Sequence, residues 1–94
     1  MIPKTVIGVI VPILKHRQVL RASVFGSFAT GTERPDSDLD LRIEFPPGKS
    51  YFDLVELELE LEAALKRKVD IVTYNTQLHP IVLEGILKEQ IPLF

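Results

Sequence analysis

The stretch Gly26–Leu41, GSFATGTERPDSDLDL, joins two segments that have the composition of β-strands. The segment before it, Val19–Phe25, is rich in β-branched and aromatic side chains, which predicts a strand buried on both faces. The segment after it alternates strictly over Asp38–Phe45, with an apolar side chain at every second position. This alternation predicts a half-buried strand with one polar face. Between the strands, Ser27–Thr30 is long enough for one helical turn that ends at Gly31.

Two aspartates, Asp38 and Asp40, stand two residues apart on the polar face of the second strand. Residues i and i+2 of a strand point to the same side, about 6.5–7 Å apart, so both carboxylates can face one site. A third acid, Asp70, lies in the short β-branched segment Val69–Thr73, where an unpaired carboxylate would be costly. If that segment runs parallel to the second strand, all three acids share one edge of the sheet. Arg42 is on the same face and is expected to pair with Asp40 or, alternatively, to reach a phosphate.

Gly26 and Ser27 follow the first strand directly. A glycine lets the backbone approach a ligand closely, and Ser27 offers a hydroxyl and an N–H at the start of a helical turn, which favours an anion. These features predict a turn that binds phosphate, although a strand-ending glycine followed by an ordinary helix cap is the alternative. Two exposed acids alone are also more often a solvated edge than a metal site. Together with a phosphate, however, three carboxylates need a cation, and hard oxygen ligands favour Mg²⁺.

The rest of the chain predicts an α/β (α+β) fold in which a small mixed β-sheet is flanked by helices. Ser50 and Asp53 form a capping box for a long helix that connects the second and third strands. The expected helices span residues 3–16, about 51–68 and about 80–89, and residues 91–94 are expected to dock on the body of the protein.

The long helix carries two apolar stripes at helical spacing, and a small sheet is expected to bury only one of them well. The other stripe is then an interface with a second copy or a partner, unless the first helix and the C-terminal tail cover both. The first stripe comprises Leu54, Leu57, Leu61 and Leu65, and the second comprises Phe52, Val55, Leu59 and Ala63. Their acidic border, expected to select a basic partner, comprises Glu56, Glu58, Glu60 and Glu62.

The composition narrows the class of protein. A chain of 94 residues with 46% hydrophobic and 26% charged residues is expected to form one domain, residues 1–94. The absence of cysteine excludes disulfides and thiolate metal sites and suits a reducing, cytoplasmic compartment. The longest apolar run, Thr5–Leu14, is interrupted by Pro12 and is about half as long as a membrane-spanning helix, so no membrane association is expected.

The pattern Gly26-Ser27, Asp38-x-Asp40 and Asp70 resembles the minimal nucleotidyltransferases (MNT) of the DNA-polymerase-beta superfamily, including the MntA-like antitoxins of HEPN/MNT toxin–antitoxin systems. The resemblance extends over nearly the whole chain and implies a single minimal nucleotidyltransferase domain with the polymerase-beta-type fold. It also implies two Mg²⁺ ions and ATP, whose α-phosphorus is attacked by a hydroxyl while pyrophosphate leaves. By this resemblance Asp38 and Asp40 hold both metals and Asp70 completes the site at the attacking hydroxyl. Gly26 and Ser27 then bind the β- and γ-phosphates.

The same resemblance implies a protein partner, because similar proteins are commonly paired with a HEPN-domain toxin. The leading hypothesis is a Mg²⁺-dependent transfer of AMP from ATP to a tyrosine or serine hydroxyl of that partner. The alternative is a catalytically weak or inactive antitoxin that acts only by protein–protein contact. The small size and Thr30, where the family usually has an arginine, favour this alternative. Self-association is also considered, whereas direct nucleic-acid binding is not expected, because the chain has no second domain to grip a primer or tRNA.

Overall fold

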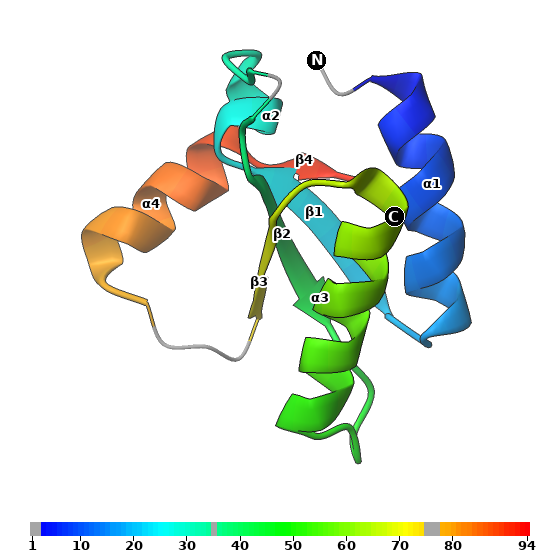
Figure 1. The fold of residues 1–94 in the computed structure, drawn as a ribbon. Helices are drawn as coiled ribbons and strands as arrows, with labels where there is room; N and C mark the ends of the chain where they lie inside the picture. The colour runs from blue at the N-terminus through cyan, green and yellow to red at the C-terminus, as the bar shows by residue number, and fades with distance from the viewer. Residues whose placement is uncertain (1–2, 35, 75–77) are drawn as a thin grey trace.

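The computed structural model describes residues 3–34, 36–74 and 78–94 and shows a four-stranded sheet flanked by helices (Figure 1). The strands follow the order β3-β2-β1-β4. Strand β1 is antiparallel to both β2 and β4, whereas β2 and β3 are parallel, with α3 as their crossover. The predicted mixed sheet is therefore confirmed. The elements are α1 Lys4–His16, β1 Arg21–Phe25, α2 Ser27–Thr30, β2 Leu39–Glu44, α3 Tyr51–Leu65, β3 Val69–Thr73, α4 Pro80–Glu89 and β4 Ile91–Pro92.

Two residues with left-handed backbone conformation lie near element boundaries that differ from the prediction. Helix α3 ends at Leu65, three residues before the predicted end, because Lys66 adopts a φ of 55°. Strand β1 begins at Arg21, two residues later than predicted, after Gln18 turns the chain with a φ of 66°. Neither residue is a glycine, so the sequence carries no usual signal for these turns.

The C-terminal tail docks on the sheet, as predicted, and forms the short strand β4 along the free side of β1. The carbonyl of Ala22 accepts a hydrogen bond from Leu93 N at 2.8 Å, and the carbonyl of Phe94 accepts one from Ala22 N at 3.2 Å. The Phe94 ring lies under the ammonium group of Lys15, which is 5.3 Å from the ring centroid. The tail therefore joins β1 to α1.

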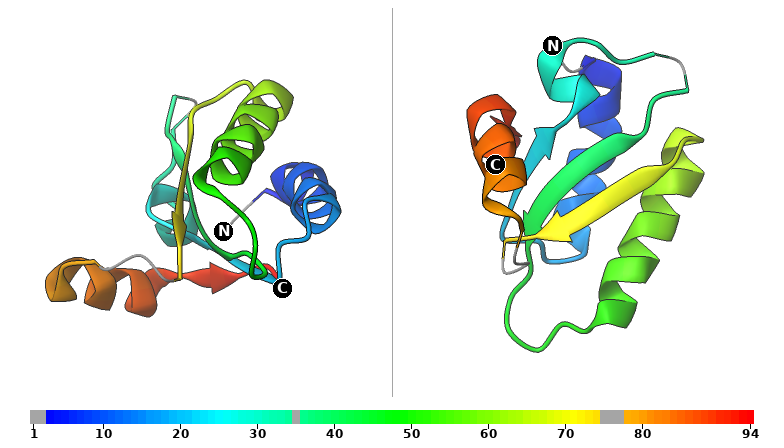
Figure 2. Two further views of the ribbon diagram at one scale, coloured as in Figure 1. Left: turned by 90° about the horizontal axis from the view of Figure 1, so that it is seen from below. Right: turned by 90° about the vertical axis from the view of Figure 1, so that its left-hand side faces the viewer.

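Helices α1 and α3 lie side by side on one face of the sheet, and α4 lies on the other side (Figure 2). In the described part of the chain, no helix stands in front of β2 and β3 on that second face. The apolar side chains of the strands point toward α1 and α3 and form the core with them. Its fully buried members include Ile10, Leu14, Val24, Leu39, Leu41, Ile43, Leu57 and Leu61. The polar face of β2 consequently remains on the open side.

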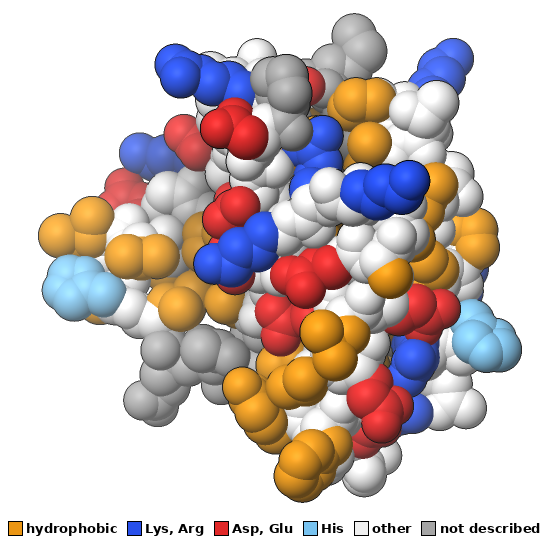
Figure 3. Space-filling model, in the orientation of Figure 1, with side chains coloured by type: hydrophobic (Ala, Val, Ile, Leu, Met, Phe, Trp, Pro, Cys, Tyr) orange, Lys and Arg blue, Asp and Glu red, His pale blue; other side chains and the backbone are white. Residues whose placement is uncertain are grey.

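Helix α3 buries one of its two apolar stripes, as predicted. Leu57 and Leu61 are fully buried, whereas 78% of Phe52 and 60% of Leu59 are exposed. Figure 3 shows hydrophobic side chains gathered on the surface over α3. The alternative prediction, in which the first helix and the tail cover both stripes, is wrong.

Two acids of α3 cover the outer edge of β3. The Glu62 carboxylate accepts a hydrogen bond from Val69 N at 3.0 Å, and Glu58 accepts one from the backbone N–H of Ile71. Acids spaced i and i+4 on the helix thus match N–H groups spaced i and i+2 on the strand. This pairing protects a strand edge that would otherwise expose unpaired donors.

Two further acids of α3 join it to α1. Arg17 donates to Glu60 at 2.8 Å and to Glu56 at 3.0 Å. All four acids that the sequence suggested as a border for a basic partner are therefore engaged within the chain. They hold α3 between α1 and β3.

The lengths of the helices limit what they can span. The longest, α3, has 15 residues. Among the residues that the structure describes, no helix is both long enough and apolar enough to cross a membrane.

Candidate active site

Asp40 lies at the centre of the open face of the sheet. Its backbone pairs with Phe25 of β1 on one side and with Asp70 of β3 on the other. Paired residues of neighbouring strands lie about 5 Å apart, and their side chains share one face. Asp38 precedes the first residue of β2. The structure thus brings together the three acids that the sequence analysis selected.

The three carboxylates also interact electrostatically. The pKa of Asp40 is raised from its usual 3.8 to about 6, chiefly by burial and then by the charges of Asp70 and Asp38. A carboxylate between two others favours its protonated form unless a cation compensates the charge. The site therefore has the electrostatic character of a cation-binding position.

Gly26 lies directly behind Asp40. Its φ of 73° and ψ of −150° fall in a region that is essentially restricted to glycine. A β-carbon at this position would overlap Oδ2 of Asp40 and would lie 3.1 Å from its Cγ. The sequence analysis predicted that the backbone of Gly26 approaches a ligand closely. The structure shows that the side chain of Asp40 also lies against this glycine.

Ser27 begins the short helix α2, which the sequence also predicted. The carbonyl of Gly26 accepts hydrogen bonds from Ala29 N at 3.0 Å and Thr30 N at 3.2 Å. The Thr30 hydroxyl lies 3.3 Å from the carbonyls of Gly26 and Ser27 and 2.9 Å from the hydroxyl of Thr32. Thr30 therefore closes α2 locally.

Arg42 does not pair with Asp40 as expected. Its guanidinium stacks 4.3 Å from the centroid of the Tyr74 ring, and Arg21 stacks on the same ring at 3.9 Å. The Tyr74 hydroxyl lies 3.1 Å from Ser23 Oγ. The expectation failed because Tyr74, 32 positions further along the chain, offers a π face that local spacing does not reveal.

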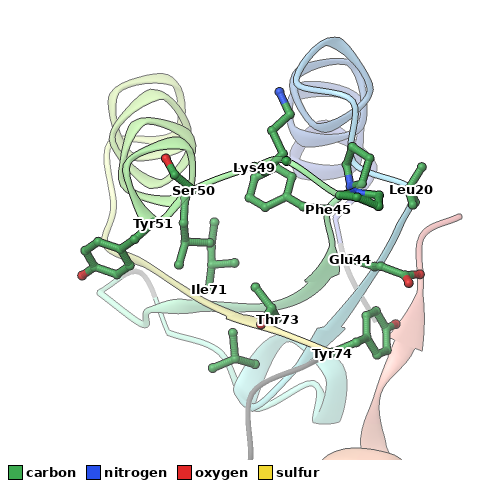
Figure 4. A pocket seen from close by; sticks show the side chains of 14 residues that line it. Leu20, Glu44, Phe45, Lys49, Ser50, Tyr51, Ile71, Thr73 and Tyr74 are labelled. Atoms are coloured by element: carbon green, nitrogen blue, oxygen red, sulfur yellow. The ribbon is translucent and has the colours of Figure 1, made fainter.

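A cavity of about 750 Å³ lies at the opposite end of the strands from the three acids. Figure 4 shows Leu20 and Tyr51 on opposite sides of it, with Phe45 and Ile71 between them. Its residues come from the end of β2, the loop that follows it, the start of α3, the end of β3, and Leu20 before β1. This cavity is therefore separate from the candidate active site.

The donor set of the site fits a hard divalent cation. Carboxylate oxygens are the preferred protein ligands of Mg²⁺. Strand pairing places Asp70 beside Asp40, and Asp38 directly precedes β2. Among the described residues, no three His, Cys, Asp or Glu side chains already form a metal-binding cluster. The three carboxylates are therefore neighbours, but their oxygen atoms do not converge on one metal position.

A family model, polymerase beta nucleotidyltransferase, matches residues 9–94, which include all five candidate site residues. The chain belongs to this family. Over 82 residues it is 46% identical to a protein of Methanocaldococcus jannaschii named "Putative protein adenylyltransferase MJ0435", and the match covers 87% of each chain. Over 71 residues it is 35% identical to "Protein adenylyltransferase MntA" of Thermococcus cleftensis, covering 76% of this chain and 71% of that protein. The predicted membership and enzyme class, a nucleotidyltransferase, are confirmed.

Solved structures confirm the polymerase-beta-type nucleotidyltransferase fold. A toxin–antitoxin crystal structure with AMP-PNP has a TM-score of 0.80 at 21% identity, covering 94% of this chain and 72% of that one. A Shewanella oneidensis structure, described as a tri-AMPylated HEPN toxin in complex with MNT antitoxin, has a TM-score of 0.75 at 17% identity. That match covers 97% of this chain and 71% of the other. At these identities the similarity concerns the fold.

Proposed function

We propose that this protein is a Mg²⁺-dependent protein adenylyltransferase that moves AMP from ATP to a hydroxyl of a HEPN-domain partner and thereby acts as an antitoxin. The observation that carries the proposal is the position of Asp40, between Asp38 and Asp70 and directly against Gly26. Relatives named protein adenylyltransferases and a similar fold in an AMPylated HEPN complex support the reaction and the partner.

Each site residue has a role that its place in the fold allows. Asp38 and Asp40 would hold Mg²⁺, and Asp70, on the neighbouring strand, would complete the metal site next to the acceptor hydroxyl. Gly26 and Ser27 would bind the β- and γ-phosphates at the end of β1. When bound, the metal ions would stabilise charge on the attacking and leaving oxygens. The chain's own contribution is to orient the triphosphate and to collect the carboxylates on one face.

The open face of β2 and β3 provides access for a protein substrate. In the described residues no helix stands in front of these strands, so this face of the sheet would be available to a protein substrate (Figure 2). The bond that forms joins the acceptor oxygen to the α-phosphorus of ATP, and the bond that breaks releases pyrophosphate. The hydroxyl proton leaves with solvent or a neighbouring base.

The alternative is an antitoxin that binds its partner without transferring AMP. Thr30 favours this alternative, because its hydroxyl closes α2 instead of offering a charge to the triphosphate. A binding-only antitoxin would neutralise the toxin equally well with Asp38→Asn or Asp40→Asn. An adenylyltransferase would lose neutralisation with either change.

The deciding experiment incubates the purified protein with its HEPN partner, Mg²⁺ and ATP labelled on the α-phosphate. Transfer predicts label on the partner, at a tyrosine or serine that mass spectrometry identifies, and no label with Asp40→Asn. ATP labelled on the γ-phosphate serves as the matched control, because adenylyl transfer leaves that label in pyrophosphate. A stable complex without any label would favour the binding-only antitoxin.

A further inference from the structure

Arg67 connects two parts of the candidate site that lie far apart in the sequence. It stands in the short connection between α3 and β3, directly after the left-handed residue Lys66. Its Nη1 donates to the carbonyl oxygen of Ser37 at 3.0 Å. The centre of its guanidinium lies 4.9 Å from the centroid of the Phe28 ring. One side chain thus contacts the residue before Asp38 and the residue after Ser27.

The contact with Ser37 matters because Asp38 is not part of a strand. On the far side of Asp38, Leu39 N donates to the carbonyl of Lys68 at 2.9 Å, which begins the ladder between β2 and β3. On the N-terminal side of Asp38, two hydrogen bonds lie within the turn itself. Ser37 N donates to the carbonyl of Arg34 at 2.9 Å, and Arg34 N donates to Ser37 Oγ at 2.6 Å. The described residues of this turn are 33, 34, 36 and 37. Among them, the hydrogen bond between Ser37 and Arg67 is the one that connects the turn to another part of the chain.

The contact with Phe28 provides a fixed reference for that turn. Phe28 is 1% exposed and belongs to the core, although it directly follows Ser27 in α2. A guanidinium can stack its planar face on a ring while its N–H edge donates to a carbonyl, which an ammonium group cannot do in one fixed geometry. Arg67 therefore relates the main chain before Asp38 to the buried side of α2.

We infer that Arg67 is a positioning residue that holds the Asp38 turn in register with the Gly26–Ser27 turn, so that the carboxylates and the phosphate-binding backbone remain aligned. The inference rests on the proposed metal and nucleotide site. It assigns Arg67 no contact with substrate, since its partners in the structure are Ser37 and Phe28. Loss of the guanidinium leaves Leu39 held by Lys68 and frees the chain on the near side of Asp38.

Three variants separate positioning from charge and from folding. Arg67→Met removes the charge and the donors, whereas Arg67→Lys keeps the charge and most of the length but loses the planar fork. Lys68→Met is the matched control, because it removes one positive charge at the next residue and leaves its backbone carbonyl in place. Thermal unfolding and the amide spectra of α1 and β4 report whether each variant folds.

The readouts are the amide resonances of residues 36–40 and the affinity for Mn²⁺, used as a paramagnetic substitute for Mg²⁺. Arg67→Met and Arg67→Lys are each expected to shift or broaden these resonances and to weaken Mn²⁺ binding about tenfold, as seen when groups that orient metal ligands are lost. Lys68→Met is expected to match the parent protein. An Arg67→Lys variant that is folded and binds Mn²⁺ like the parent would overturn the inference, as would an equal loss in Lys68→Met.

These readouts do not depend on AMP transfer. A parent protein that binds Mn²⁺ at residues 38–40 but never labels a partner would contradict the proposed adenylyl transfer and leave the role of Arg67 standing. A parent protein that does not bind Mn²⁺ at all would overturn both. If transfer is observed, Arg67→Lys should lower kcat more than it raises KM for ATP, because the phosphate-binding turn itself is unchanged.

Discussion

Gly26 and Asp40 occupy adjoining space: a β-carbon on Gly26 would overlap the carboxylate oxygen Oδ2 of Asp40. Asp40 lies on β2, and Gly26 directly follows Phe25, which is the backbone partner of Asp40 on the antiparallel strand β1. The absence of a side chain at Gly26 thus leaves space for the Asp40 carboxylate, in addition to the proposed approach of a phosphate. This relationship ties the proposed nucleotide-binding turn and the proposed metal site into one unit.

The first prediction concerns Gly26→Val. The new side chain must displace Asp40 and must adopt a φ of 73°, so we expect a loss of about 3 kcal/mol in the free energy of unfolding. Binding of ATP in the presence of Mg²⁺, measured by titration calorimetry, should fall below detection. Gly8→Ala is the control, because a β-carbon at Gly8 meets nothing within 4 Å and should stabilise α1 by up to about 1 kcal/mol. ATP binding to folded Gly26→Val with parental affinity would contradict the arrangement.

The second prediction concerns the pH dependence of stability in metal-free protein. The folded-state pKa of Asp40 is raised from 3.8 to about 6, so the folded state binds more protons than the unfolded state between these values. Asp40 therefore lowers the free energy of unfolding as the pH rises through this window, and the deficit persists above it. Because the group is partly exposed, we expect Asp40→Asn to stabilise the metal-free protein at pH 7 by about 1 kcal/mol.

Urea unfolding at pH 4 and pH 7 measures this effect. Asp40→Asn should gain stability over the parent at pH 7 and little at pH 4. Addition of Mg²⁺ should stabilise the parent and not the variant, since a ligand stabilises the state that binds it. A variant that is less stable than the metal-free parent at pH 7 would show that the carboxylates do not repel one another in the folded protein.

The third prediction separates the roles of the acids. Asp70→Asn should lower the rate of AMP transfer by about two orders of magnitude while changing ATP affinity much less, because Asp70 is assigned to the acceptor hydroxyl. Asp38→Asn should reduce both, because Asp38 is assigned to both metals. Single-turnover rates and calorimetric ATP affinities for the two variants provide the comparison. An Asp70→Asn variant that loses ATP affinity more than rate would reverse the assignment.

Most of the elements could be predicted from local sequence patterns. Strict alternation located β2, the Ser50–Asp53 capping box located the start of α3, and the ranges Val69–Thr73 and Pro80–Glu89 agree with the structure. The boundaries that differ lie near Gln18 and at Lys66, where a non-glycine residue adopts a left-handed conformation. Residue propensities do not predict a left-handed conformation at glutamine or lysine, because glycine is its usual signal.

The candidate site was predictable in part. Period-two spacing and a parallel crossover were enough to bring Asp38, Asp40 and Asp70 together, and their catalytic and metal-binding roles stay predictions. The roles of Arg67 and Tyr74 were not predictable, because their partners lie 30 and 51 positions away. Such contacts depend on the three-dimensional arrangement of side chains and leave no periodic signal.

The fourth prediction tests which face of α3 is core. Leu57→Ala should lower the free energy of unfolding by about 3 kcal/mol, because Leu57 is fully buried and its truncation leaves a cavity. Leu59→Ala, two residues further along, should change it by less than about 0.5 kcal/mol, because 60% of Leu59 is exposed. Chemical denaturation of both variants makes the comparison. Equal losses would mean that Leu59 is covered in solution, for instance by a second copy, which sedimentation of the parent protein would detect.

The last prediction concerns Lys66, which caps the C-terminus of α3 with a φ of 55°. This position is usually occupied by glycine, and here it is occupied by a residue with a side chain. A left-handed conformation costs a residue with a side chain about 1–2 kcal/mol, and glycine avoids this cost. Glycine, however, loses more conformational entropy on folding, which offsets about 0.5–1 kcal/mol of the stabilisation. Lys66→Gly should therefore stabilise the protein by up to about 1 kcal/mol, measured by urea unfolding. Lys68→Gly is the matched control, because Lys68 does not have a positive φ, and it should destabilise the protein by a similar amount. If Lys66→Gly also destabilised the protein, the left-handed end of α3 would not be the conformation that delivers Arg67 to Ser37.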